Sequence, residues 1–258
     1  MISYFGELYK AREVFLNLTA RDLKIRYKRS VLGVLWAVAE PLIQMVIYTI
    51  VFSLLLQVKK DNYPIFVLCG LLPWSFFQTG VTHPLSSITG NASLIKKVYF
   101  YREILPLSQI AARSIHFLLS LVLLFIFLGV SDIPFTLNVL YLPVIIVVQL
   151  VLICGLGVLL SALNTFWSDI GFLTNFVLTS VFYLTPVLYP VSMVPERFRD
   201  FFMMNPVACL IYNYRRVLID GLPLDMPTFA YATVLSILVA ALGFTLFRRL
   251  DHRLAEVL

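Results

Sequence analysis

Long runs of apolar residues alternate with short polar segments along the whole chain. An α-helix rises 1.5 Å per residue, so about 20 apolar residues cross the hydrocarbon core of a bilayer. The pattern therefore predicts an all-α membrane protein with six transmembrane helices, at residues 33–56, 64–81, 104–130, 139–163, 172–188 and 228–247. Pro73 is expected to break the second of these helices. Gly155 and Gly157 are expected to let another helix pack closely against the fourth.

The first 32 residues follow a different pattern. Residues 4–29 predict an amphipathic helix with one apolar stripe that includes Leu16 and Leu23, and a second that includes Leu18 and Ile25. A helix in the membrane interface needs only one apolar face, so the second stripe indicates a contact with protein. The alternative is a basic anchor that only holds the chain at the membrane surface.

A proline-rich segment, residues 189–227, separates the last two predicted spans. Its middle again has helical periodicity, with Asn205 suited to cap the helix and Pro206 at its first position. Gly221 is expected to end this helix. We expect the helix to lie in the outer interface of the membrane or to enter the membrane and return.

The composition is that of a single membrane-embedded domain, residues 1–258. Hydrophobic residues make up 60% of the chain, charged residues make up 13%, and the mean hydropathy is +0.90. Residues 1–32 are expected to form an interface helix and residues 33–188 the first five spans. Residues 189–227 are expected to form an outer re-entrant region, and residues 228–258 the last span with its tail.

The distribution of basic residues predicts the orientation. The N-terminal segment, the loop at residues 91–103 and the tail together carry 13 of the 20 lysines and arginines. Basic flanks stay in the cytoplasm, so both termini are expected to be cytoplasmic in a multi-pass protein of the inner (plasma) membrane. Span ends and lipid head groups account for the bases, so the net charge of +6 does not indicate nucleic-acid binding.

The chain has no constellation that would support catalysis. Its three histidines have no Cys, Asp or Glu at metal-ligand spacing, and its three cysteines are dispersed in apolar sequence. It has no Gly-Lys pair and hence no nucleotide-binding P-loop. We therefore expect no enzyme activity, no metal site and no cofactor bound by this chain, and a role in transport.

Besides His116, the predicted spans contain only two mid-span ionisable residues, Glu40 and Arg113. Ion-driven carriers keep several such groups at mid-membrane, so this scarcity disfavours a secondary carrier. Arg113 is expected to extend its charge to the cytoplasmic edge of its helix. The alternative is that it meets Glu40 or an anionic substrate.

Two spans carry polar and aromatic residues at helical spacing on one face, and polar groups are costly to expose to lipid. We expect both faces to line a channel, because packing seams favour Gly, Ala and Ser, whereas these stripes place large aromatic residues between polar groups. The alternative is interhelical hydrogen bonding that only holds the helices together. The predicted channel residues are Trp36, Glu40, Gln44, Tyr48, Phe172, Asn175, Thr179, Phe182 and Tyr183.

Four motifs together resemble the ABC-2-type permeases of polysaccharide and teichoic-acid exporters. They are RYKRSVLGVLWAVAEPLIQMVIYTIVF at residues 26–52, LIKKVYFYREILPLS at 94–108, FYLTPVLYP at 182–190 and NPVACLIYNYRRVLIDG at 205–221. They occur in the order typical of the family and are spread over residues 26–221. One departure is Ser168-Asp169, where the family usually has Arg-Asp, so a role for that arginine does not transfer.

The resemblance implies a homodimer that pairs with two copies of a separate ATPase, which binds ATP and Mg²⁺. It implies export of a lipid-linked polysaccharide such as O-antigen, capsule or a teichoic-acid-like polymer. The alternatives are an ABC-2 exporter of a small molecule or drug, and a non-transporting membrane scaffold. Co-purification with an ATPase would exclude the scaffold.

Two further sets of residues receive roles on this basis. The basic residues of the N-terminal helix are expected near a lipid phosphate or the pyrophosphate of the substrate, namely Arg21, Lys24 and Lys28. The first cytoplasmic loop resembles a coupling helix that docks on the ATPase, with Leu94, Ile95, Lys96, Lys97, Val98 and Tyr99.

Overall fold

A computed structural model describes residues 12–28, 32–57, 60–97, 100–131, 133 and 135–257. Within these residues every regular element is a helix, which confirms the all-α fold. The α-helices are α2 (Arg12–Tyr27), α3 (Trp36–Thr49), α4 (Tyr63–Thr82), α5 (Ala92–Lys97), α6 (Ile104–Val130), α7 (Leu142–Phe166), α8 (Asp169–Leu184), α9 (Glu196–Met203), α10 (Pro206–Leu218) and α11 (Met226–Val257). Shorter turns of other helical types are η1 (Gly33–Leu35), η2 (Ile50–Leu55), η3 (His83–Ser86), η4 (Thr89–Asn91), η5 (Leu137–Tyr141) and η6 (Val191–Met193).

Five helical stretches of the described chain are long and apolar enough to cross a membrane, and they match expected spans 1 to 4 and 6. They are Gly33–Ser53, Tyr63–Ser86, Ile104–Val130, Leu137–Phe166 and Met226–Leu254. The expected fifth span corresponds to α8, which has 16 residues. At 1.5 Å per residue α8 is about 24 Å long, shorter than a hydrocarbon core of about 30 Å. A sixth crossing therefore stays a prediction.

The expected break at Pro73 does not occur, because α4 continues through it from Tyr63 to Thr82. Helix α4 is the central helix of the bundle, with 78% of its apolar window buried. Neighbouring helices supply polar partners at this level: Gln149 Nε2 on α7 donates to the Pro73 carbonyl at 2.7 Å. The carbonyl that Pro73 leaves without its usual helical donor is that of Cys69, four residues earlier, and tight packing by the neighbouring helices allows the proline inside α4.

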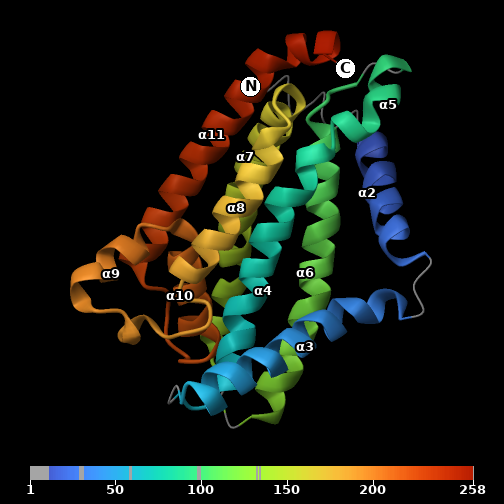
Figure 1. Ribbon diagram of the computed structural model, residues 1–258. Coiled ribbons are helices and arrows are strands. Elements are labelled where there is room, and N and C mark those ends of the chain that lie inside the picture. Colours follow the sequence, from blue (N-terminus) through green and yellow to red (C-terminus); the bar gives the residue numbers. More distant parts are fainter. Residues whose placement is uncertain are drawn as a thin grey trace.

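Helices α7 and α11 pack directly on each other (Figure 1). A Cβ atom at Gly155 would lie 2.5 Å from Ala240 Cα, and a Cβ at Gly243 would collide with the Gly155 carbonyl. A Cβ at Gly157 would lie 2.9 Å from Ile110 Cδ1 on α6. The expected close-packing role is therefore confirmed: Gly155 has no room for a side chain against the α11 backbone, and Gly157 is in tight contact with α6.

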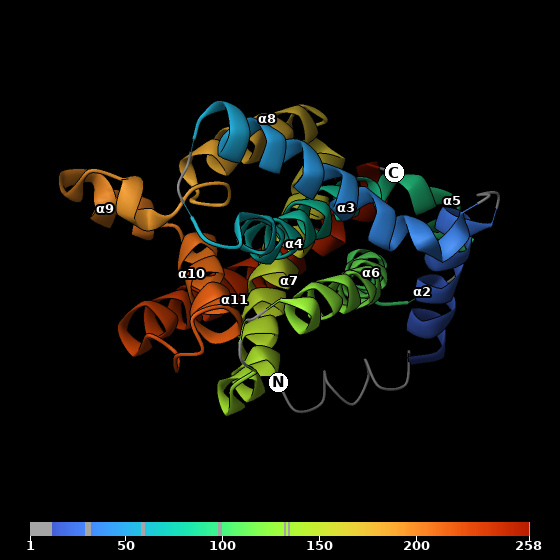
Figure 2. The same ribbon diagram turned by 90° about the horizontal axis from the view of Figure 1, so that it is seen from below.

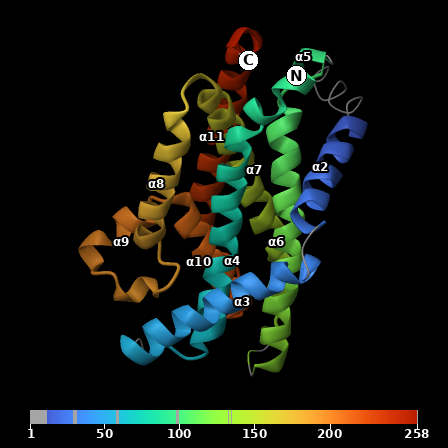
Figure 3. The same cartoon turned by 45° about the vertical axis from the view of Figure 1, so that its right-hand side comes forward.

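The first two described helices wrap one side of this bundle. Helix α2 runs beside α6, and α3 then crosses α4 and α6 obliquely (Figures 1 and 3). Leu18 packs on Ile104 and Leu105, whereas Leu16 and Ile25 are 60% and 69% exposed. One face of α2 thus contacts protein, as its second apolar stripe predicted, although Ile25 is not part of that contact.

The ends of the bundle differ in what they carry. Helix α5 and the C-terminal part of α11 lie at one end, and α9 and α10 lie at the other (Figures 1 and 3). The cap predicted for α10 is confirmed, because Val207 N donates to Asn205 Oδ1 at 2.9 Å and Pro206 opens the helix. Gly221 follows with φ +65°, a conformation that glycine adopts without strain.

Candidate functional site

The two predicted channel stripes meet at one end of α3. Helices α3 and α8 lie next to each other on one side of the bundle (Figure 2). The ring centroids of Tyr48 and Phe182 are 6.3 Å apart, and those of Phe182 and Tyr183 are 5.3 Å apart. Trp74 of α4 completes the group, 5.5 Å from Phe182. The sequence analysis did not include Trp74 in the channel, because its contact with Phe182 depends on how α4 packs against α8.

The rest of the α8 stripe is exposed. Phe172 is 79% exposed, Tyr183 is 67% exposed, and Asn175 and Thr179 are also exposed. The polar groups bond within the helix: Asn175 Nδ2 donates to the Gly171 carbonyl and Thr179 Oγ1 to the Asn175 carbonyl, both at 2.8 Å. Helix α8 therefore has an exposed face of aromatic side chains, with Asn175 and Thr179 hydrogen-bonded within the helix, that points away from the core of this chain.

The first half of the α3 stripe faces a different group of helices. Glu40 and Gln44 line a small cavity of about 20 Å³ together with residues of α4 and α6. Glu40 Oε2 lies 3.7 Å from Arg26 Nη2 at the end of α2. Trp36 is 43% exposed. The α3 stripe is therefore divided, with Tyr48 against α8 and Glu40 against α2 and α6.

Basic side chains from three elements gather beside Glu40. Arg26 Nη2 lies 3.4 Å from His116 Nε2 on α6. Arg113, one turn earlier on α6, has Nη2 2.9 Å from His83 Nδ1 on η3. Glu40 thus pairs with Arg26, and Arg113 has a histidine as its partner.

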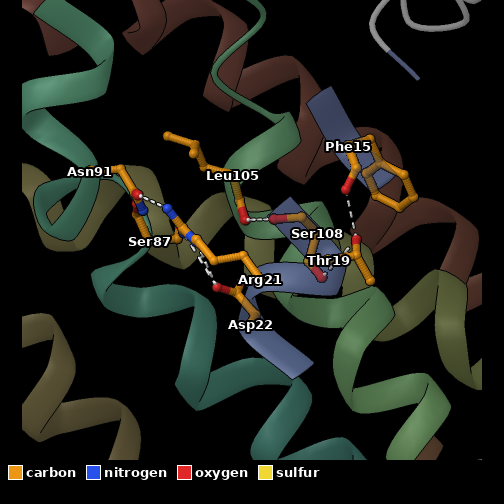
Figure 4. A network of polar contacts seen from close by, with 8 residues as sticks. All are labelled: Phe15, Thr19, Arg21, Asp22, Ser87, Asn91, Leu105 and Ser108. Atoms are coloured by element: carbon orange, nitrogen blue, oxygen red, sulfur yellow. Dashed lines mark hydrogen bonds and ion pairs between the residues drawn. The ribbon is translucent and has the colours of Figure 1, made fainter. Parts of the chain in front are cut away.

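Helix α2 is tied to the segment before α5 by polar contacts (Figure 4). Arg21 Nη1 donates to Asn91 Oδ1 at 3.1 Å, and Arg21 also bonds Asp22 Oδ1 at 3.3 Å. Thr19 Oγ1 bonds the Ser108 carbonyl at 3.4 Å. Of the three basic residues predicted to lie near a lipid phosphate or pyrophosphate, Arg21 is therefore bound to other residues of this chain.

The other two of these basic residues, Lys24 on α2 and Lys28 just after its end, are exposed. They border an open surface groove together with Arg21 and Ile25. This face of α2 therefore presents basic groups beside an exposed apolar side chain, which suits a lipid head-group region.

Helix α5 carries four of the six predicted coupling residues. Lys96 and Lys97 are exposed, whereas Leu94 and Ile95 pack against the cluster around Leu18. Val98 and Tyr99 lie outside the described residues. The segment is short, with a half-buried apolar side and an exposed basic side, which suits a docking element.

The loop after α5 is clamped to the end of α11. Arg102 Nη1 bonds Asp251 Oδ1 at 2.8 Å and also the Asp251 carbonyl. Arg248 Nε lies 3.8 Å from Glu103 Oε1, and the Glu103 side chain is only 5% exposed. These two pairs connect the predicted coupling loop to the last helix of the chain.

At the opposite end, Arg215 of α10 is buried. Its guanidinium donates to the carbonyls of Phe66, Pro186 and Val187, and it stacks 3.6 Å from the Phe66 ring centroid. Burial lowers the pKa of Arg215 to about 10, so the group keeps its charge at neutral pH. Tyr63 Oη donates to the Leu188 carbonyl at 2.6 Å. Together they fix the turn that follows α8.

Nothing in the sequence pattern singled out Arg215, which is followed by a second arginine, Arg216, on a predicted interfacial helix. Among the described residues, no three His, Cys, Asp or Glu side chains come together in a way that could hold a metal ion.

Comparison with known proteins adds an independent result. Residues 13–219 match the family model described as ABC-2 type transporter. The chain is 34% identical over 248 residues to an "O-antigen export system permease protein RfbA" of Klebsiella pneumoniae, covering 95% of both chains. It is 33% identical to a protein of that name in Myxococcus xanthus, covering 93% of this chain and 94% of that one. It is 21% identical to a "Polysialic acid transport protein KpsM" of Escherichia coli, covering 90% and 91%. This chain belongs to the ABC-2 type transporter family.

Proposed function

We propose that this chain is the membrane-spanning permease subunit of an ATP-driven exporter of a lipid-linked polysaccharide. The observation that carries the proposal is the similarity to proteins named for O-antigen export over nearly the whole of both chains. Similarity to a polysialic acid transport protein makes a capsule-type polysaccharide a second candidate substrate. Aromatic rings beside hydrogen-bonding groups on α3 and α8 suit such sugars.

The energy source is a separate ATPase, which binds ATP and Mg²⁺ and docks on α5. Two copies of it serve a homodimer of this chain in the inner membrane. The exposed lysines on α5 and the ion pair between Arg102 and Asp251 support docking of the ATPase at this end of the bundle. Both termini are then cytoplasmic, and α8 with the turn after it supplies the sixth crossing.

The path for the polymer lies between the two copies. Helices α3 and α8 of each copy face the twofold axis, so the exposed side of α8 lines the path or contacts the second copy. The exposed polar residues Asn175 and Thr179, beside Phe172 and Tyr183, support this, because polar side chains are costly to expose to lipid. Lys24 and Lys28, with Arg21 behind them, attract the anionic lipid end of the substrate, at about 1 kcal/mol for each base near an anionic surface.

Deletion of the gene in the native bacterium, followed by extraction of lipid-linked glycans, tests the proposed function. We expect the full-length polymer to accumulate on its lipid carrier inside the cell and to disappear from the surface. Complementation with the wild-type chain restores surface polymer. Normal surface polymer in the deletion strain, with loss of resistance to a small molecule, would show a drug exporter instead.

A further inference from the structure

Arg113 is a cation inside a membrane helix, and no carboxylate of the described residues forms an ion pair with it. It lies nine residues after the start of α6, about 14 Å along that helix. Its Nη2 contacts the imidazole of His83, and its Nη1 is buried with no hydrogen-bond partner among the described residues. A charged group within a span is costly unless an opposite charge or a polar ligand compensates it.

A cavity of about 370 Å³ borders Arg113. Its walls come from α2, η3 and α6, and include Arg26, His83, Gln109 and Asp22. This volume is within the range of small-ligand sites, about 300–1,000 Å³. The cavity therefore combines two arginines with enough room for a polar head group.

The acids near this cavity are already engaged with other arginines. Asp22 Oδ1 bonds Arg21, and Glu40 pairs with Arg26. The second oxygen of Asp22, Oδ2, is buried with no donor among the described residues. One donor on Arg113 and one acceptor on Asp22 thus remain unsatisfied beside this cavity. Both atoms are buried, so each side chain has to turn toward the cavity to meet a ligand that offers an anionic oxygen and a hydroxyl.

We propose that this cavity, termed the Arg113 site, binds the phosphate of a lipid head group that also carries a hydroxyl. A planar guanidinium matches phosphate oxygens in a bidentate arrangement. The head group enters from the membrane, because the exposed Ile25 borders the cavity and offers an apolar approach for the lipid chain. The side chain of Arg113 turns toward the phosphate, and Asp22 accepts from the hydroxyl.

Two lipids share this chemistry, a phospholipid such as phosphatidylglycerol and an isoprenyl diphosphate sugar. The second identification rests on the proposed function, whereas the site itself does not. The Arg113 site differs from the basic outer face of α2, because Arg26 points to α6 while Lys24 and Lys28 are exposed.

The test measures lipid binding by native mass spectrometry on the purified full-length protein. The probes are an isoprenyl diphosphate N-acetylglucosamine, phosphatidylglycerol and inorganic phosphate. Charge-assisted hydrogen bonds contribute about 1.5–3 kcal/mol, so Arg113→Gln should weaken lipid binding roughly 10- to 100-fold. Arg113→Lys should retain part of the binding. Arg253→Gln, an exposed arginine near the end of α11, should bind as the wild type does.

Loss confined to the isoprenyl probe identifies the substrate lipid, and loss confined to phosphatidylglycerol identifies a membrane phospholipid. Unchanged binding of both lipids to Arg113→Gln overturns the proposal, as does Arg113-dependent binding of inorganic phosphate alone. If Arg113→Gln fails to fold, Arg26→Gln provides the same comparison, with weaker lipid binding expected. Binding is measured without export, so a failure of the proposed function leaves this result interpretable.

Discussion

The guanidinium of Arg215 occupies the space that Gly70 leaves open. A Cβ atom on Gly70 would collide with Arg215 Nη2 and would lie 2.8 Å from the Val187 carbonyl oxygen. Glycine in the middle of α4 therefore allows α10 to reach the turn after α8. One small residue and one buried cation hold three segments together that are far apart in the chain.

We expect Gly70→Ala to destabilise the protein, although alanine usually favours a helix. Overpacking of a filled site costs about 1–3 kcal/mol, which outweighs the gain of roughly 0.5–1 kcal/mol in helix propensity. Thermal unfolding of the purified protein in detergent measures the change. Gly129→Ala is the matched control, because Gly129 is also helical and no described atom lies within 4 Å of the position that the new methyl group would take. Equal melting temperatures for the two variants would contradict the relationship.

Arg215→Met should loosen the turn after α8. It removes the donors for the buried carbonyls of Pro186 and Val187, and each buried group left unsatisfied costs about 1–3 kcal/mol. Hydrogen exchange followed by mass spectrometry should show faster exchange in peptides covering residues 182–190. Arg216→Met is the control, since Arg216 donates to the Pro223 carbonyl from a more exposed position. Faster exchange across the whole protein, or none, would count against a local role.

The helical fold could be predicted from the sequence, because an apolar run of this length that crosses a membrane has to satisfy its backbone hydrogen bonds internally, as an α-helix does. The span predicted at residues 104–130 is correct for this reason. The cap at Asn205 is correct because an asparagine before a proline is a local signal for the start of a helix. The expected break at Pro73 was wrong, because local propensity does not record how tightly neighbours enclose α4.

The candidate site was harder to predict, because helical spacing shows which residues share a face but not which helix that face meets. The α3 stripe looked continuous, yet Glu40 pairs with Arg26 of α2 while Tyr48 contacts Phe182 of α8. The local sequence does not predict that Arg215 is buried, because its partners are backbone carbonyls of two other segments. Such contacts depend on tertiary structure.

The clamp between Arg102 and Asp251 should influence coupling more than stability. The pair is partly exposed, with side-chain exposures of 17% and 37%, so its loss should cost about 1 kcal/mol or less. We expect Arg102→Gln to lower the polymer exported per ATP hydrolysed, because the loop after α5 is no longer tied to α11. Export and ATPase rates in proteoliposomes measure the ratio. Arg253→Gln should leave it unchanged, and an unchanged ratio in Arg102→Gln would exclude a coupling role for the clamp.

The aromatic group where α3 meets α8 should set the rate of polymer passage. An aromatic contact contributes about 0.5–1.5 kcal/mol beyond its buried area, so Tyr48→Ala or Tyr183→Ala should slow export roughly two- to tenfold. Basal ATPase activity and expression should stay near the wild-type level, because Tyr183 is exposed and Tyr48 is only partly buried. Tyr141→Ala, an exposed tyrosine on η5, serves as the control.

Thiol labelling distinguishes a channel from a packing seam along the same stripes. Single cysteines at positions 40, 44, 175 and 179 are introduced after the native Cys69, Cys154 and Cys209 are replaced by alanine. A small hydrophilic reagent should reach all four positions in the assembled transporter and should react more slowly while polymer is being exported, because the polymer occupies the path. Cysteines on the buried face of α8, at Thr174 and Leu178, should stay unreactive. Reaction at 174 and 178 with none at 175 and 179 would mean that the second copy or lipid covers the exposed face of α8, and the path would have to lie elsewhere.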